Sequence, residues 1–183
     1  MSHIEYELRV LEIDEEQIKG KLKNLGATLV EEVFQRRYVY DFNPKKENKW
    51  IRLRTNGKVT TLAIKNIVST NIDGTKELEI IVDDFDITNK ILFELGYKPK
   101  GFQENKRITY DLNGTEIDID TWPSIPTFLE IEGKNEKEVY DTLELLGISK
   151  EKTTTLGVQS IYLNFYNIDI EKDPNLSFDK EEC

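Results

Sequence analysis

Short segments in which apolar and polar residues alternate make up much of this chain. Alternation of this kind is typical of β-strands, because successive side chains point to opposite faces. It predicts eight strands, at Ile4–Leu11, Gln35–Phe42, Trp50–Thr55, Val59–Asn66, Lys76–Val82, Lys106–Asp111, Thr115–Asp120 and Thr127–Gly133. Helical spacing interrupts them at Glu15–Leu25, Ile87–Leu95 and Glu136–Leu146, and a glycine follows each of these segments as a typical helix stop. We therefore expect an α+β fold.

About eight strands with one polar and one apolar face favour a closed or nearly closed barrel. If the charged faces point outward, the protein has an ordinary apolar core and a solvated surface. If they point inward, the lumen is charged and helices cover the apolar outside. The alternation by itself leaves both arrangements open.

The first and middle parts of the chain resemble each other. The segment 37–41 (RYVYD) matches the segment 107–111 (RITYD), and 5–7 (EYE) matches 77–79 (ELE). Similar halves suggest a pseudo-symmetric structure around a shared centre. Strand–helix–strand units also look alike by composition alone, so the match is a hypothesis.

The charge of the chain limits its partners. A formal net charge of −10 over 183 residues argues against broad binding to nucleic acids or anionic membranes, which needs a positive surface. It leaves room for a small anion in a local basic pocket. Whether the chain forms a homodimer stays open.

The cysteine and histidine counts limit the chemistry. Cys183 is the only cysteine, and no segment reads as a signal peptide or a membrane span, so a cytoplasmic location is the default. His3 is the only histidine, which argues against Ser-His or Cys-His catalysis and the usual zinc sites. A metal here should be hard and oxygen-liganded, such as Mg²⁺ or Mn²⁺.

Pairs of like charges spaced two residues apart recur along the predicted strands. Glu5 and Glu7 would share one strand face, and so would Arg52 and Arg54. A single such pair is more often a solvated face with cross-strand ion pairs. Their recurrence over most of the chain favours a site for a polyanion, since an arginine fork grips phosphate oxygens and a divalent cation bridges phosphates to carboxylates.

These residues resemble the CYTH superfamily, also called triphosphate tunnel metalloenzymes. The opening segment 5–9 (EYELR) is similar to the family's Glu-x-Glu-x-Lys signature. The segments 117–123 (IDIDTWP) and 128–133 (FLEIEG) look like its acidic half. The resemblance implies an eight-stranded antiparallel β-barrel, a triphosphate tunnel, with charged residues in the lumen and flanking helices outside.

The resemblance also implies roles for individual residues. The metal-binding carboxylates would be Glu5, Glu7, Asp120, Glu130 and Glu132, holding Mg²⁺ or Mn²⁺. The phosphate-binding cations would be Arg9, Arg52, Arg54, Lys65, Arg107, Lys76 and Arg37. Glu79 matches a tunnel carboxylate that would hold a basic residue or a second metal.

Two positions depart from the family pattern. Arg9 replaces the usual lysine and is a poor proton acceptor, which puts a role as base in doubt. Asn105 stands two residues before Arg107, where many relatives carry a basic residue. Lys106 is adjacent, but on a regular strand it points to the other face.

The resemblance implies an enzyme acting on a small triphosphate, and the class IV adenylyl cyclase branch is the nearest in length and in the segment 122–126 (WPSIP). An inorganic or organic triphosphatase is the first alternative, and a non-catalytic polyphosphate- or nucleotide-binding module is the second. We expect residues 1–166 to form one pseudo-symmetric barrel domain and 167–183 an acidic C-terminal tail. The part from Asp169 to Cys183 would be a mobile lid or a disordered end, and we favour the disordered end.

Overall fold

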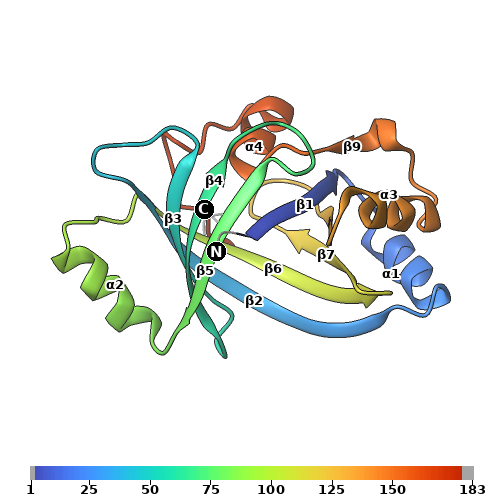
Figure 1. Cartoon of the computed structure of the whole chain (residues 1–183), viewed down its shortest axis with the longest axis horizontal. Helices are drawn as coiled ribbons and strands as arrows, with labels where there is room; N and C mark the ends of the chain where they lie inside the picture. Colours follow the sequence, from blue (N-terminus) through green and yellow to red (C-terminus); the bar gives the residue numbers. More distant parts are fainter. Residues whose placement is uncertain (1–2, 179–183) are drawn as a thin grey trace.

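Eight antiparallel strands close into a barrel in the computed structural model, which describes residues 3–178 (Figure 1). The strands are β1 (His3–Val10), β2 (Thr28–Asp41), β3 (Lys49–Thr55), β4 (Thr60–Ile67), β5 (Thr75–Val82), β6 (Gly101–Leu112), β7 (Thr115–Thr121) and β8 (Phe128–Gly133). They follow one another around the barrel as β5-β4-β3-β2-β6-β7-β8-β1. Pairing of His3 with Glu77 and of Glu5 with Thr75 joins β1 to β5 and closes the ring. The predicted barrel is confirmed.

Strands β2 and β6 are longer than the sequence pattern predicted. They pair from Thr28–Asp111 at one end to Val39–Gly101 at the other. The register shifts between Leu29 and Glu31, and this irregularity interrupts the alternation of side chains along β2. The pattern therefore became readable only from Gln35 onward.

The three predicted helices lie outside the barrel as α1 (Glu15–Asn24), α2 (Phe85–Glu94) and α3 (Glu136–Leu145). Asp14, Asp84 and Asn135 cap them by accepting a hydrogen bond from the backbone N–H three residues later. A fourth helix, α4 (Val158–Tyr166), follows a short 3₁₀ turn η1 (Lys150–Lys152) and strand β9 (Thr153–Thr154), and the sequence pattern missed it. None of the helices within residues 3–178 combines the length and apolar character needed to cross a bilayer.

The apolar core lies between the barrel wall and the helices. Leu8, Ile117 and Ile131 point outward from the barrel and are fully or almost fully buried. They pack with side chains such as Leu22 of α1 and Leu143 of α3. Because the apolar faces point outward beneath helices, the charged faces point into the lumen.

The chain continues past α4 as an ordered segment, residues 167–178, which we call the C-terminal strap. Ile170 and Leu176 of the strap are buried in an apolar cluster that includes Tyr162 of α4. Leu176 also forms a parallel bridge with Gln103 of β6. The expectation of a disordered end is therefore wrong for residues 169–178, because these apolar side chains have a surface to pack on. The rest of the predicted tail, 179–183, lies outside the described residues.

Gly101 allows the strap to cross β6 at close range. A Cβ atom at this position would lie 2.3 Å from the carbonyl oxygen of Pro174. We expect Gly101→Ala to lower the free energy of unfolding by about 1–3 kcal/mol through overpacking, measured by thermal or urea denaturation. The control is Gly20→Ala in α1, where a Cβ would meet nothing within 4 Å. Gly20→Ala should raise stability by about 0.5–1 kcal/mol, because alanine favours a helix interior. A Gly101→Ala variant as stable as the parent protein would contradict the close contact.

Candidate active site in the barrel

The lumen holds a cavity of about 730 Å³ that side chains from all eight strands line. Residues at the start of α4 and in the C-terminal strap complete its wall. Every predicted site residue but one borders this cavity, namely Arg9, Arg37, Arg52, Arg54, Lys65, Arg107, Glu5, Glu7, Glu79, Asp120, Glu130 and Glu132. The structure thus brings the predicted cations and carboxylates together, while their roles as ligands stay predictions.

Lys76 is the exception, and its assignment to the phosphate site was wrong. It is exposed and does not border the cavity. On β5 the side chains of Glu77 and Glu79 point inward, so the alternation of the strand directs Lys76 outward with Leu78.

One wall of the cavity carries a group of arginines, which we call the cationic wall: Arg37 on β2, with Arg52 and Arg54 on β3. Arg37 and Arg54 are direct cross-strand partners. Glu77 and Glu79 hold Arg52 at 2.8 Å and 2.9 Å. Arg54 has only a more distant contact, 3.6 Å from Glu79. Arg52 next to it, together with burial, lowers the pKa of Arg54 to about 10.

Arg37 is the least neutralised member of the cationic wall. Its side chain is buried and forms hydrogen bonds to two amide oxygens, those of Gln35 (3.1 Å) and Asn105. Its guanidinium also stacks on Trp122, 4.5 Å from the ring centroid. Burial and the charges of neighbouring arginines, first Arg54, lower the pKa of Arg37 well below its ordinary value. An anion bound between these arginines would reduce their mutual repulsion.

The contact of Arg37 with Asn105 explains one departure from the family pattern. Asn105 is fully buried on β6, where it accepts from Arg37 and donates to Asp120 at 2.8 Å. Arg37 therefore brings a positive charge from the neighbouring strand to a position where relatives carry a basic residue on β6. Lys106 is exposed and its ammonium lies 5.0 Å from the ring of Phe178, so it does not substitute.

The opposite wall carries a belt of carboxylates on β1, β7 and β8, which we call the carboxylate wall: Glu7, Glu116, Glu130 and Glu132. Glu132 is the direct cross-strand partner of Glu7 on one side and of Glu116 on the other. Burial and these like charges, with Glu130 the strongest among them, raise the pKa of Glu132 to about 7. Like charges directly opposite each other destabilise a sheet, so a bound cation would stabilise this group of carboxylates.

Arg9, on β1, lies within the carboxylate wall and is firmly held by its neighbours. Its guanidinium lies 2.8 Å from Glu7 and 2.5 Å from Glu130, and it donates to the carbonyl oxygen of Leu156 at 3.1 Å. Burial alone would lower the pKa of Arg9, but Glu130 and Glu7 outweigh it and raise the pKa above its ordinary value. Arg9 is thus locked as a cation, which rules it out as a base.

Arg107 has a similar position on β6. It contacts Asp118 and Asp120 at 2.5 Å each and Glu130 at 3.2 Å. Burial lowers its pKa, yet these carboxylates, first Asp118, raise it well above the ordinary value. Asp120 therefore faces a guanidinium in this structure, and its predicted role as a metal ligand would require it to share its oxygens.

A third charged group lies where β1, β4 and β5 meet. Lys65 lies 2.9 Å from Glu5 and 3.8 Å from Glu77. Burial, followed by the hydrogen bond with Glu77, raises the pKa of Glu5 to about 9. The site prediction included Glu5 and Lys65 but omitted Glu77, although the internal repeat had already matched Glu77 to Glu5.

Other cavity residues were also missing from the predicted site. They include Glu116 on β7, Trp122 after β7, Lys45 between β2 and β3, Lys100 before β6, and Glu171 in the strap. Glu116 lies two residues before Asp118, so the alternation of β7 could have indicated it. The positions of Lys45, Lys100 and Glu171 depend on loop and strap packing, for which the sequence carries no periodic signal.

The carboxylate wall suits a hard divalent cation in the chemistry of its donors, which are all oxygens. Within residues 3–178, no three Asp, Glu, His or Cys side chains converge on a common point. Mg²⁺ is usually held by one or two carboxylates together with substrate phosphates, not by a complete protein cage. Glu130 and Glu132, two residues apart on β8, fit that incomplete arrangement.

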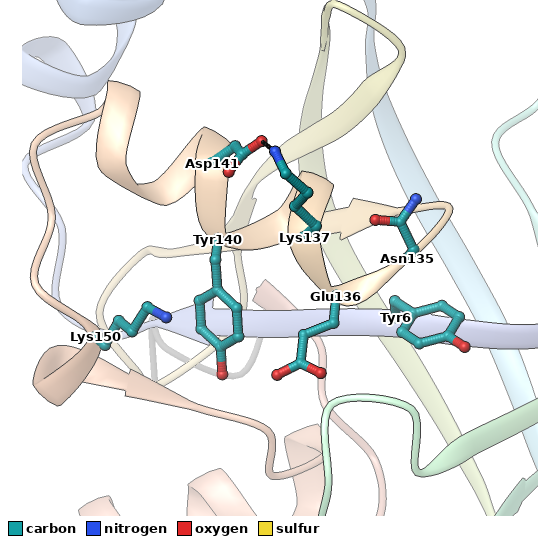
Figure 2. Close-up of a pocket in the computed structure, with 7 residues that line it drawn as sticks. All are labelled: Tyr6, Asn135, Glu136, Lys137, Tyr140, Asp141 and Lys150. Carbon is teal, nitrogen blue, oxygen red and sulfur yellow. Dashed lines mark hydrogen bonds and ion pairs between the residues drawn. The ribbon is translucent and has the colours of Figure 1, made fainter.

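A second hollow, of about 640 Å³, lies outside the barrel against α3 and β1 (Figure 2). Of its two lysines, Lys137 pairs with Asp141, and Lys150 lies 3.6 Å from the ring centroid of Tyr140. No arginine lines this hollow. It therefore lacks the convergent cations that the barrel cavity offers to an anion.

Solved structures share this fold. Protein PH1012 from Pyrococcus horikoshii OT3 has a TM-score of 0.73 and 24% identity over 84% of this chain and 96% of its own. An adenylate cyclase candidate from Vibrio parahaemolyticus has a TM-score of 0.75 and 13% identity, over 88% and 98%. A Hippeastrum adenylyl cyclase candidate with a dominant triphosphatase activity has a TM-score of 0.59 and 19% identity, over 91% and 96%. At these identities the likeness shows the fold.

A comparison with curated proteins found no match. The family model of the CYTH domain matches residues 3–160, which include the whole barrel and the start of α4. The chain therefore belongs to the CYTH family.

Proposed function

We propose that this protein is a divalent-metal-dependent enzyme that processes a small triphosphate. CYTH-domain proteins are generally triphosphate-processing enzymes that use divalent metals. The observation that carries the proposal is the pair of opposed like-charged walls: arginines on β2 and β3 face carboxylates on β1, β7 and β8 across one cavity. A triphosphate with its divalent cation supplies the two charges that these walls lack.

The residues of the chain would bind and orient the substrate. Arg37 and Arg54 would donate hydrogen bonds to phosphate oxygens, since among the described residues neither has a carboxylate oxygen within 3.5 Å. Glu130 and Glu132 would hold the cation, which when bound offsets charge on the phosphates and the leaving group. Positioning and electrostatic stabilisation supply most of the rate in phosphoryl transfer, and this set of side chains provides both.

Two reactions fit this site. In ATP cyclisation the ribose 3′-hydroxyl attacks the α-phosphate, as the resemblance to class IV adenylyl cyclases implies. In hydrolysis water attacks the terminal phosphate. The cavity lining supports hydrolysis as a second candidate. Among the described residues that line the cavity, the Trp, Tyr and Phe side chains are Trp50 and Trp122, and Arg37 already stacks on Trp122. Within the described part of the chain, an adenine ring would therefore have Trp50 as the one tryptophan that no arginine covers.

The test is incubation with Mg²⁺ or Mn²⁺ and, separately, ATP, tripolyphosphate and thiamine triphosphate, followed by separation of the products. Cyclic AMP with pyrophosphate identifies a cyclase, and orthophosphate identifies a triphosphatase. Omission of the metal should abolish either product. Triphosphate binding without turnover would identify a binding module, and the absence of binding would refute a triphosphate site.

A further inference from the structure

The barrel end where β2 ends and β6 begins carries a second set of cations, apart from the cationic wall. Lys45 follows β2, Lys100 precedes β6, and both border the cavity. Glu171 of the C-terminal strap lies between them, 3.7 Å from Lys45 and 3.0 Å from Lys100. A carboxylate of the protein itself therefore occupies a place between two ammonium groups at the cavity rim.

The strap is a built part of this rim. It lies beyond residues 3–160, the part that matches the CYTH model. Its Ile170 is buried and borders the cavity next to Glu171. The close passage of Pro174 over Gly101 and the bridge from Leu176 to Gln103 fix its path along β6. Packing on both sides of Glu171 thus sets the position of its carboxylate.

We propose that Lys45 and Lys100 form an outer anion subsite, which Glu171 fills in the free protein and which binds phosphate groups beyond the third of a polyphosphate held in the barrel. The inference rests on the proposed function, because the inner three phosphates are assigned to the triphosphate site. It adds a class of ligand, the linear polyphosphates longer than three units, and a residue that competes with them.

The exposure of Lys45 and Glu171 supports displacement of Glu171, while the side chain of Lys100 is 24% exposed. The side chains of Lys45 and Glu171 are 51% and 45% exposed. Ion pairs between such exposed groups contribute little to stability, so their exchange for another anion costs little. The cavity is continuous from this rim to the cationic wall, which allows one extended anion to reach both.

The rim also contains carboxylates that limit what it binds. Asp41 lies 3.7 Å from Lys100, and Glu47 borders the cavity as well. A ligand with a single carboxylate would therefore gain little over Glu171. A phosphate group that carries more charge on more oxygens gains more, and an extended chain adds the contacts of the inner site.

The test compares inorganic tripolyphosphate with a short-chain inorganic polyphosphate by calorimetric titration without divalent metal, so that turnover does not interfere. Replacing both lysines (Lys45→Ala with Lys100→Ala) should weaken polyphosphate binding about tenfold and leave tripolyphosphate binding unchanged. Glu171→Gln should tighten polyphosphate binding about threefold, because the competing charge is gone. Lys172→Ala is the matched control: this strap lysine pairs with Asp169, is 84% exposed and does not border the cavity.

Equal losses for both ligands, or no loss for either, in the double lysine variant would overturn the outer subsite. So would an unchanged polyphosphate affinity in Glu171→Gln, which decides the matter if the double variant folds poorly. Failure of the proposed function looks different, because the parent protein would then bind tripolyphosphate neither without metal nor in the presence of Mg²⁺. Arg54→Ala separates the sites further, since it should weaken both ligands.

Discussion

Arg54→Ala should weaken triphosphate binding by about ten- to a hundredfold without lowering the stability of the ligand-free protein. A charge-assisted hydrogen bond from a guanidinium contributes about 1.5–3 kcal/mol, which sets the loss of affinity. Arg54 lies directly opposite Arg37, and its nearest carboxylate, Glu79, is as far away as 3.6 Å. Its removal therefore relieves repulsion in the free cavity while it deletes a phosphate contact.

The measurement combines calorimetric titration of tripolyphosphate with thermal unfolding in the presence and absence of the ligand. We expect an unchanged or higher melting temperature without ligand and a reduced stabilisation by it. Lys76→Ala removes the same charge from the outer face of β5 and should change neither quantity. A variant at Arg54 that unfolds earlier yet binds tripolyphosphate as tightly as the parent protein would show that the arginine is structural.

The alternation of polar and apolar residues did not by itself predict that the charged strand faces line the lumen. Periodicity along β1 or β8 places Glu5 with Glu7 and Glu130 with Glu132 on common faces, but it is equally compatible with a solvated exterior. The resemblance to the CYTH family decided the direction correctly, because the family pattern includes the order of the motifs along the chain. The assignment of Lys76 failed on a constraint present in the sequence, since a regular strand cannot point both Lys76 and Glu79 inward.

Other features depend on contacts that no local pattern encodes. The bond between Arg37 and Asn105 joins residues 68 positions apart, and it follows from the register of β2 on β6. Helix α4 has nine residues, and its N-cap is Gly157, which offers no side-chain hydrogen bond, so the helix lacks the signal that marked the other helices. The strap is ordered because Ile170 and Leu176 pack in an apolar cluster that includes residues distant in the sequence, such as Trp122 and Phe128.

The carboxylate wall offers a sharper test of metal binding at Glu132 than at Glu130. Glu130 holds both Arg9 and Arg107, so Glu130→Gln leaves two buried guanidinium groups with fewer partners and should cost stability as well as activity. Among the residues that the structure describes, Glu132 has carboxylates as its direct cross-strand partners, Glu7 and Glu116. Above pH 7, where Glu132 is ionised, loss of its charge should instead stabilise the free protein by about 0.2–1 kcal/mol for each relieved pair.

Glu132→Gln should therefore combine equal or greater stability with a loss of metal-dependent turnover of about a hundredfold or more, because one oxygen ligand of the cation is lost. Turnover as a function of Mg²⁺ or Mn²⁺ concentration, together with thermal unfolding, measures both effects. Tripolyphosphate binding without metal should be unchanged or tighter, since a negative charge has left the cavity.

Glu116→Gln is the control, because Glu116 lies opposite Glu132 on the neighbouring strand and is not assigned to the cation. This variant should be more stable than the parent protein and should keep its turnover. A Glu132→Gln variant with the turnover and metal requirement of the parent protein would remove Glu132 from the metal site, and the carboxylate wall would then bind its cation through Glu7 and Glu130.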